Sequence, residues 1–99
     1  MSRFDVFKNP DAAGWLLNVQ SNLLDGLNTR VVVPLLPMDS APLTARRLNP
    51  VFIINGEKAV MTTQFMAAVP ERELQSYVTN LQNHQAEIQE ALDLLLLGF

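Results

Sequence analysis

The sequence predicts a mainly β fold that ends in one C-terminal α-helix. In the first two thirds of the 99-residue chain, short apolar runs alternate with Gly, Pro and Asn, a pattern typical of strands joined by turns. From about Asn80 onward the apolar residues recur at alternating spacings of four and three, which is the periodicity of a helix. No repeat, low-complexity tract or long linker separates these parts, so we expect residues 1–99 to form a single domain.

Two strands are predicted near the N-terminus. Residues 4–8 alternate between apolar and polar side chains and end at an Asn-Pro dipeptide, which interrupts a strand. Residues 15–19 form a second run that ends in a polar Gln-Ser-Asn segment. An Asp-Gly dipeptide at 25–26 then signals a turn.

A third strand is predicted over residues 30–36, because valine predominates there and favours a pleated, half-buried surface. Pro34 has no N–H group to donate, so this strand should be bent or partly at a sheet edge at that position. Residues 37–50 contain three prolines and are expected to form an irregular excursion.

A β-hairpin is predicted at Asn55 and Gly56, between strands at residues 51–54 and 57–62. A type I′ turn needs a positive φ at both central positions, and Asn-Gly is the dipeptide that adopts it most readily.

The predicted C-terminal helix carries one apolar stripe, which begins just after the strand region. Polar residues cover the other faces of this helix, so the stripe should pack on the sheet. We expect Leu92 and Leu95 to belong to the core. The stripe consists of Leu81, Gln85, Ile88, Leu92, Leu95 and Phe99.

The four leucines at 94–97 point in every direction around the helix axis, so a single stripe cannot bury them all. We therefore expect Leu96, Leu97 and Phe99 to contact a partner. Gly98 has two interpretations, a C-cap glycine or a site of close contact with that partner.

The composition indicates an oligomer that does not bind nucleic acid unaided. Apolar residues make up 48% of the chain and charged residues 17%, so we expect part of the apolar surface to be buried in a homodimer. The net charge is −3 and the isoelectric point is about 4.9, whereas phosphate contacts need a concentrated positive surface. Contact with DNA is therefore expected only through a partner.

Several kinds of site are excluded or disfavoured by the residue inventory. The chain has no cysteine, so it holds no disulfide and no thiolate ligand. His84 is the only histidine and has no companion ligands, so we expect no metal, no cofactor and no catalytic residue. Neither end carries an apolar run long enough to span a bilayer, which leads us to expect a cytoplasmic protein without membrane contact.

A family resemblance extends along almost the whole chain. Its segments are FDVF at 4–7, NVQS at 18–21, LLD at 23–25, RVVVPL at 30–35, LNP at 48–50, MTT at 61–63, AVP at 68–70, and a helix that closes in Gly98-Phe99. No one segment is distinctive. In this order and at these separations they make the chain similar to the CcdB family of toxins.

The resemblance implies a bent antiparallel sheet that closes into a small barrel (SH3-like), a short side sheet, a C-terminal helix and a homodimer. It also implies binding to the A subunit of DNA gyrase, with trapping of the enzyme–DNA cleavage complex. A CcdA-like antitoxin would neutralise the toxin through an extended C-terminal segment. The toxin–antitoxin complex would repress its own operon, with the antitoxin supplying the contact with operator DNA, which is consistent with the acidic isoelectric point.

Family members contact gyrase at the end of the C-terminal helix and at a nearby Ser-x-hydrophobic-hydrophobic segment. The resemblance implies that the matching positions of this chain are Ser21, Leu23, Leu24, Asp93, Leu96, Leu97, Gly98 and Phe99.

Three of these positions, Asp93, Leu97 and Phe99, depart from a well-studied member of the family. That member ends in Trp-Gly-Ile, where this chain has Leu97-Gly98-Phe99, and it has an asparagine where this chain has Asp93. The tryptophan stacks on a gyrase arginine, and leucine has no π-face with which to do so.

Two alternatives to a gyrase poison remain. A degenerate member would keep the fold and antitoxin binding but would not poison gyrase. An endoribonuclease is also considered, since the MazF and Kid toxins share the barrel, but RNA cleavage needs acid–base groups in a basic groove. The chain has seven Lys and Arg against ten Asp and Glu, which disfavours that alternative.

Overall fold

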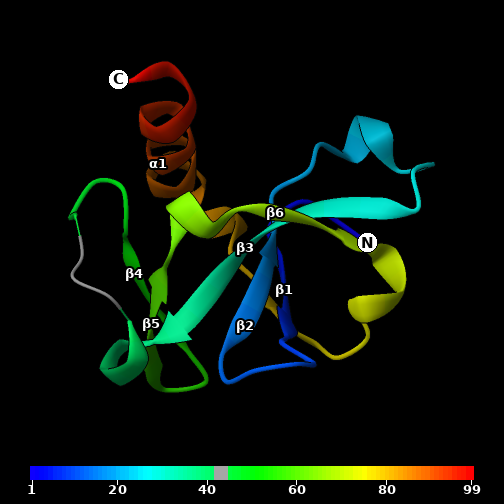
Figure 1. Ribbon diagram of the computed structural model, residues 1–99, viewed down its shortest axis with the longest axis horizontal. Helices are drawn as coiled ribbons and strands as arrows, with labels where there is room; N and C mark the ends of the chain where they lie inside the picture. The colour runs from blue at the N-terminus through cyan, green and yellow to red at the C-terminus, as the bar shows by residue number, and fades with distance from the viewer. Residues whose placement is uncertain (42–44) are drawn as a thin grey trace.

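The computed structural model describes residues 1–41 and 45–99 and contains seven strands and one α-helix over that part of the chain (Figure 1). The strands are β1 (Asp5–Lys8), β2 (Trp15–Asn18), β3 (Thr29–Pro37), β4 (Val51–Ile54), β5 (Glu57–Met61), β6 (Ala67–Pro70) and β7 (Tyr77–Asn80). The helix is α1 (Gln85–Leu97). Short 3-10 helices are η1 (Asn22–Leu24), η2 (Met38–Ser40), η3 (Thr63–Phe65), η4 (Glu71–Glu73) and η5 (Gln82–His84).

All the strands pair antiparallel in one curled half-barrel sheet with two arms that share β3. One arm runs β7-β1-β2-β3-β6, and the shorter arm runs β3-β5-β4. In Figure 1 the long strand β3 crosses from one arm to the other. The predicted fold class is confirmed: mainly β with one C-terminal helix, a bent antiparallel sheet and a short side sheet, here continuous with the main one through β3.

The change of partners along β3 explains how the strand accommodates Pro34. On one side, β3 pairs with β6 over residues 29–32 and with β5 over residues 35–37, so Pro34 lies in the interval between them. Its carbonyl accepts hydrogen bonds from the Thr62 backbone N–H at 3.0 Å and from Thr62 Oγ1 at 2.7 Å. The prediction of a locally edge-like strand is confirmed, because no ladder N–H is needed at this position.

The β4–β5 hairpin also agrees with the prediction. Asn55 and Gly56 have φ angles of 51° and 83°, the left-handed conformation that a type I′ turn requires at both positions. The irregular excursion predicted over residues 37–50 contains η2 and a turn in its described part, and its residues 42–44 lie outside the described part.

The predicted start of the helix is wrong, and the strands β6 and β7 were not predicted. Residues 77–80 pair with β1, and α1 begins only at Gln85, after η5. The Leu81 N–H donates to the Phe4 carbonyl at 2.9 Å, and Asn80 Nδ2 donates to Asp5 Oδ1 at 2.9 Å. These bonds tie residues 80 and 81 to the first strand, so the α-helix begins four residues after Leu81, where the predicted apolar stripe starts.

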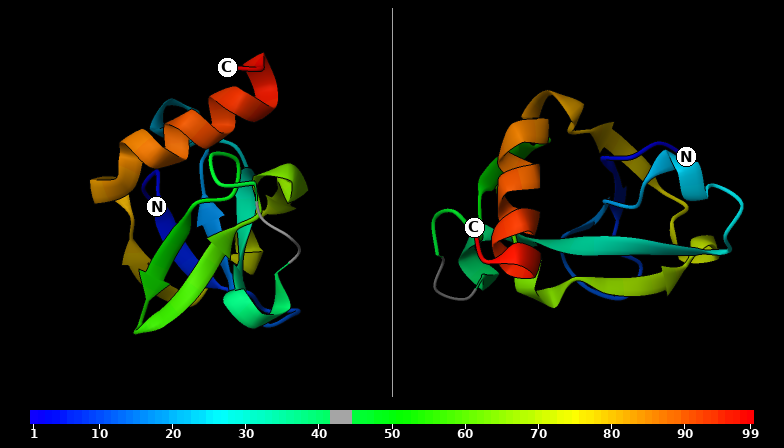
Figure 2. Two further views of the ribbon diagram at one scale, coloured as in Figure 1. Left: turned by 90° about the vertical axis from the view of Figure 1, so that its left-hand side faces the viewer. Right: turned by 90° about the horizontal axis from the view of Figure 1, so that it is seen from above.

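The main core lies between the curled sheet and the first half of α1. Ile88, Ala91 and Leu92 from the helix are buried with side chains of β1 to β5. Leu95 was predicted to be core, but it is 37% exposed, so that prediction is wrong. The physical reason is visible in Figures 1 and 2, where the last turns of α1 project beyond the sheet.

Candidate functional site

The last turn of α1 is an exposed apolar surface. Leu96 is 64% exposed, Leu97 61% and Phe99 79%. Gly98 has a φ of 85°, and its N–H donates to the carbonyls of Asp93 and Leu94, both at 3.1 Å. Gly98 is therefore a left-handed C-cap that closes the helix and turns Phe99 away from its axis.

A second exposed apolar element is η1, which follows β2. The Ser21 side chain caps it by accepting a hydrogen bond from the Leu23 N–H at 3.1 Å. This cap holds a tight turn in which Leu23 is 93% exposed and Leu24 49% exposed. Side chains of this size gain free energy when they leave water, so the turn is suited to contact with another surface.

The two elements meet at a groove of about 390 Å³. Ser21 and Leu24 line it from the η1 side, and Asp93 and Leu96 line it from α1. Residues far apart in sequence are thus brought together. The other four predicted site residues do not line the groove; they are Leu23, Leu97, Gly98 and Phe99.

A chain of polar contacts runs along one wall of this groove. Arg3 Nη2 donates to Gln89 Oε1 at 3.2 Å, and Gln89 Nε2 donates to Asp93 Oδ1 at 3.0 Å. Arg3 is also fixed by its bond to the Val19 carbonyl at 3.0 Å. Gln89 was not among the predicted site residues, although its spacing of four from Asp93 on a helix is a usable signal.

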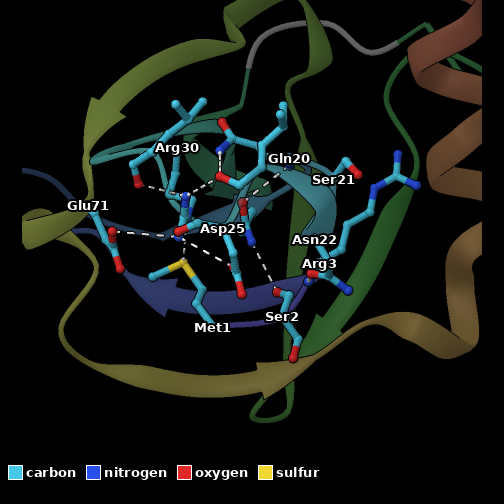
Figure 3. Close-up of polar contacts among 12 residues, drawn as sticks. Met1, Ser2, Arg3, Gln20, Ser21, Asn22, Asp25, Arg30 and Glu71 are labelled. Atoms are coloured by element: carbon cyan, nitrogen blue, oxygen red, sulfur yellow. Dashed lines mark hydrogen bonds and ion pairs between the residues drawn. The ribbon is translucent and has the colours of Figure 1, made fainter.

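Arg30 lies away from the groove surface and behind η1 (Figure 3). Its side chain is only 4% exposed, and its guanidinium group contacts backbone carbonyls and the carboxylates of Asp25 and Glu71. Its acidic neighbours belong to the same chain, so the Arg30 charge is balanced within the protein.

His84, the one histidine of the chain, precedes the first residue of α1. His84 is exposed, and its Nδ1 lies 3.3 Å from Glu87 Oε1 on the same helix face. Within residues 1–41 and 45–99 no three His, Cys, Asp or Glu side chains gather as a metal ion would require. None of the helices in that part is long and apolar enough to cross a membrane.

The sequence matches the model of one known protein family over nearly its whole length. The family model described as CcdB protein matches residues 3–98, nearly the entire chain. No curated protein matches. The match covers β1 to β7 and α1, and so includes both η1 and the residues of α1 that line the groove. The chain belongs to the CcdB family, the toxins of toxin–antitoxin systems.

Proposed function

We propose that this protein is a toxin that binds the A subunit of DNA gyrase and traps the enzyme's DNA cleavage complex. The observation that carries the proposal is the uncovered apolar end of α1, formed by Leu96, Leu97 and Phe99, beside the groove that η1 also lines. In the family these two segments are the ones that meet gyrase.

The chemistry of this surface suits tight binding to a protein. Protein interfaces concentrate their binding energy in a few large side chains at the centre, surrounded by contacts that exclude water. Phe99, Leu97 and Leu23 are large, apolar and more than half exposed, and the Asp93 carboxylate adds a hydrogen-bond acceptor oriented by Gln89.

Trapping needs no reaction on the part of the toxin. A ligand that binds one state of an enzyme more tightly than the others shifts the population toward that state. Binding to gyrase while its DNA is cleaved would therefore make broken DNA accumulate. The residues of the surface act by contact alone, which is consistent with a site made of leucines, a phenylalanine, a serine and one carboxylate.

The toxin is proposed to act as a homodimer, because the exposed apolar side chains exceed what one contact surface accounts for. Phe65 and Tyr77, on other elements, are also more than half exposed. Sedimentation or light scattering at micromolar concentration should give about twice the 11.1 kDa of the chain. A monomer over the whole range would contradict this part of the proposal.

We further propose that the toxin is cytoplasmic and is neutralised there by a CcdA-like antitoxin that binds it. The antitoxin would also supply the fold that binds operator DNA. The net charge of −3 supports this division of roles, since phosphate contacts need a concentration of positive charge. Titration of the purified toxin with operator DNA should give binding only after antitoxin is added.

The decisive experiment incubates the purified protein with gyrase, ATP and supercoiled plasmid, followed by detergent and protease to release trapped breaks. Linear plasmid should accumulate with toxin concentration. A protein that binds antitoxin without producing linear DNA would instead be a degenerate family member, for which the Leu97 departure is the structural argument. A parallel incubation with RNA alone tests for nuclease activity, and cleaved RNA would contradict the proposal.

A further inference from the structure

The start of β3 holds a buried cation. Arg30 is 3% exposed, although its backbone lies in the strand beside Val69 of β6. Arginine is rarely buried to this degree unless its donors are satisfied, because a charge that leaves water without partners is costly. The hydrogen-bond partners of the Arg30 guanidinium group therefore indicate the role of this side chain.

The guanidinium group is held mainly by backbone carbonyls of one loop. Nη1 donates to the carbonyls of Leu24 at 3.3 Å, Leu27 at 3.1 Å and Thr29 at 3.2 Å. Nη2 donates to the carbonyl of Asp25 at 3.1 Å. Four carbonyls, from the last residue of η1 to the first residue of β3, thus converge on one side chain (Figure 3).

Gln20, at the other end of this loop, reinforces the same arrangement. Its Nε2 donates to the carbonyls of Leu24 at 3.4 Å and Thr29 at 3.1 Å, and its Oε1 accepts from the Val31 N–H at 3.0 Å. Gln20 and Arg30 therefore grip the carbonyl of Leu24 from two sides. We call this pair the carbonyl clamp.

The acidic neighbours play a different part. Asp25 Oδ1 and Glu71 Oε2 each lie 3.6 Å from Arg30 Nη2, longer than a hydrogen bond, and both carboxylates are substantially exposed. They balance the charge, but they do not set the shape of the loop. The carbonyl bonds, which have directional geometry, do so.

From these contacts we infer that Gln20 and Arg30 are positioning residues: the carbonyl clamp fixes η1 in the shape in which Leu23 and Leu24 meet the target. The inference rests on the proposed function and adds to it the source of the turn's rigidity. Without the clamp, residues 22–28 keep the Ser21 cap on the Leu23 N–H, the Leu24 and Leu27 amides to the carbonyls of Ser21 and Leu24, and bonds from the Arg3 and Glu71 amides to Asn22 Oδ1 and the Asn28 carbonyl. None of these bonds ties the carbonyl of Leu24 or Asp25 to the start of β3. A loop that must be ordered on binding lowers affinity by the cost of that ordering.

The test compares Arg30→Met and Gln20→Leu with a matched control, Asn49→Leu. Asn49 is equally buried and donates through Nδ2 to the Met61 carbonyl at 2.9 Å and to Gln64 Oε1 at 2.7 Å, outside the η1 loop. Free energies of unfolding are measured for all three. Gyrase binding is then compared at a temperature where each variant is fully folded. Gln20→Leu keeps the test open if the arginine variant does not fold.

Two readouts separate positioning from general stability. Hydrogen exchange of the Leu24 and Leu27 amides should quicken at least tenfold in the clamp variants, while amides of β1 and β2 keep the wild-type rates. Gyrase affinity should fall about tenfold, mostly through slower association, because fewer molecules present the ordered turn. Asn49→Leu should change neither readout.

Folded clamp variants with wild-type exchange at these amides, or with wild-type gyrase affinity, would overturn the inference. So would an equal loss of affinity in Asn49→Leu at equal loss of stability. Failure of the wild-type protein to bind gyrase would be a different result: it would refute the proposed function, and the target role of the clamp with it.

Discussion

The two halves of α1 differ in composition and in surroundings: Gln and Glu dominate the first half, and all five leucines of the helix lie from residue 92 onward. In the first half, Ile88, Ala91 and Leu92 are buried against the sheet. In the second half, Leu95, Leu96 and Leu97 are all exposed. The change occurs within one turn and without any fall in hydrophobicity.

This contrast shows that burial along α1 is decided by what lies beneath the helix. The sheet supports the helix as far as Leu92, and the later turns project past it (Figure 2). Apolar side chains that stay in water give up the transfer free energy of burial, about 25 cal/mol for each Å² of apolar surface. A stretch that gives up this term over several leucines is better explained by binding than by folding.

The largest expected difference between the halves is in stability. Ile88→Ala should lower the free energy of unfolding by about 2–5 kcal/mol, because it removes buried methyl groups and leaves a cavity. Leu95→Ala, seven residues later on the same stripe, should cost less than about 1 kcal/mol. Urea unfolding at one fixed protein concentration measures both. Equal losses would mean that Leu95 is covered in solution, for example by a second copy of the chain.

The second difference is in binding. Deletion of residues 97–99 should abolish gyrase binding and cost about 1–2 kcal/mol of stability, since it empties no cavity and removes only the Gly98 cap. A matched control is Ile53→Ser, which removes an exposed apolar side chain from the edge strand β4. That variant should bind gyrase as the wild type does. A truncated chain that cannot fold would assign these residues to the core.

Local signals in the sequence were enough for the elements whose geometry is local. The hairpin at Asn55 and Gly56 follows from the φ angles that those two residues tolerate. The four leucines at 94–97 were expected to be too widely spread around the helix for one stripe to bury, and Leu96 and Leu97 are indeed exposed. Both predictions depend only on neighbours along the chain.

Elements held by distant partners were not predictable in this way. β7 exists because residues 77–80 pair with β1 and Asn80 bonds to Asp5, more than seventy positions away. No local pattern predicted a strand over these four residues, and the helical spacing begins only at Leu81. The burial of Arg30 likewise depends on how the loop before β3 folds back, which no pattern around position 30 encodes.

The residues of the candidate site were predicted from the family resemblance, and not from the spacing of residue types along the sequence. Nothing in the spacing of Ser21 and Leu24 relates them to Asp93 and Leu96. The groove that all four line arises because the curled sheet carries η1 toward the side of α1. The resemblance named these positions. The contacts of Arg3 and Gln89 along the wall came only from the structure.

The smallest expected effect concerns Leu97, where the family pattern has a tryptophan. Leu97 is exposed at the projecting end of α1, so an indole ring in place of its side chain fits there without displacing core atoms. Tryptophan would add contact area and a cation–π interaction of about 0.5–2 kcal/mol with a gyrase arginine. Leu97→Trp should therefore bind gyrase about two to thirty times more tightly, mainly through slower dissociation.

Surface plasmon resonance with immobilised gyrase A subunit measures this change, and Phe99→Leu is the matched variant. If Leu97 occupies the anchor position, Leu97→Trp tightens binding and Phe99→Leu weakens it only slightly. Unchanged or weaker binding by Leu97→Trp, together with a large loss in Phe99→Leu, would refute the assignment of Leu97. The aromatic anchor would then be Phe99, which the left-handed cap at Gly98 already directs away from the helix and into solvent.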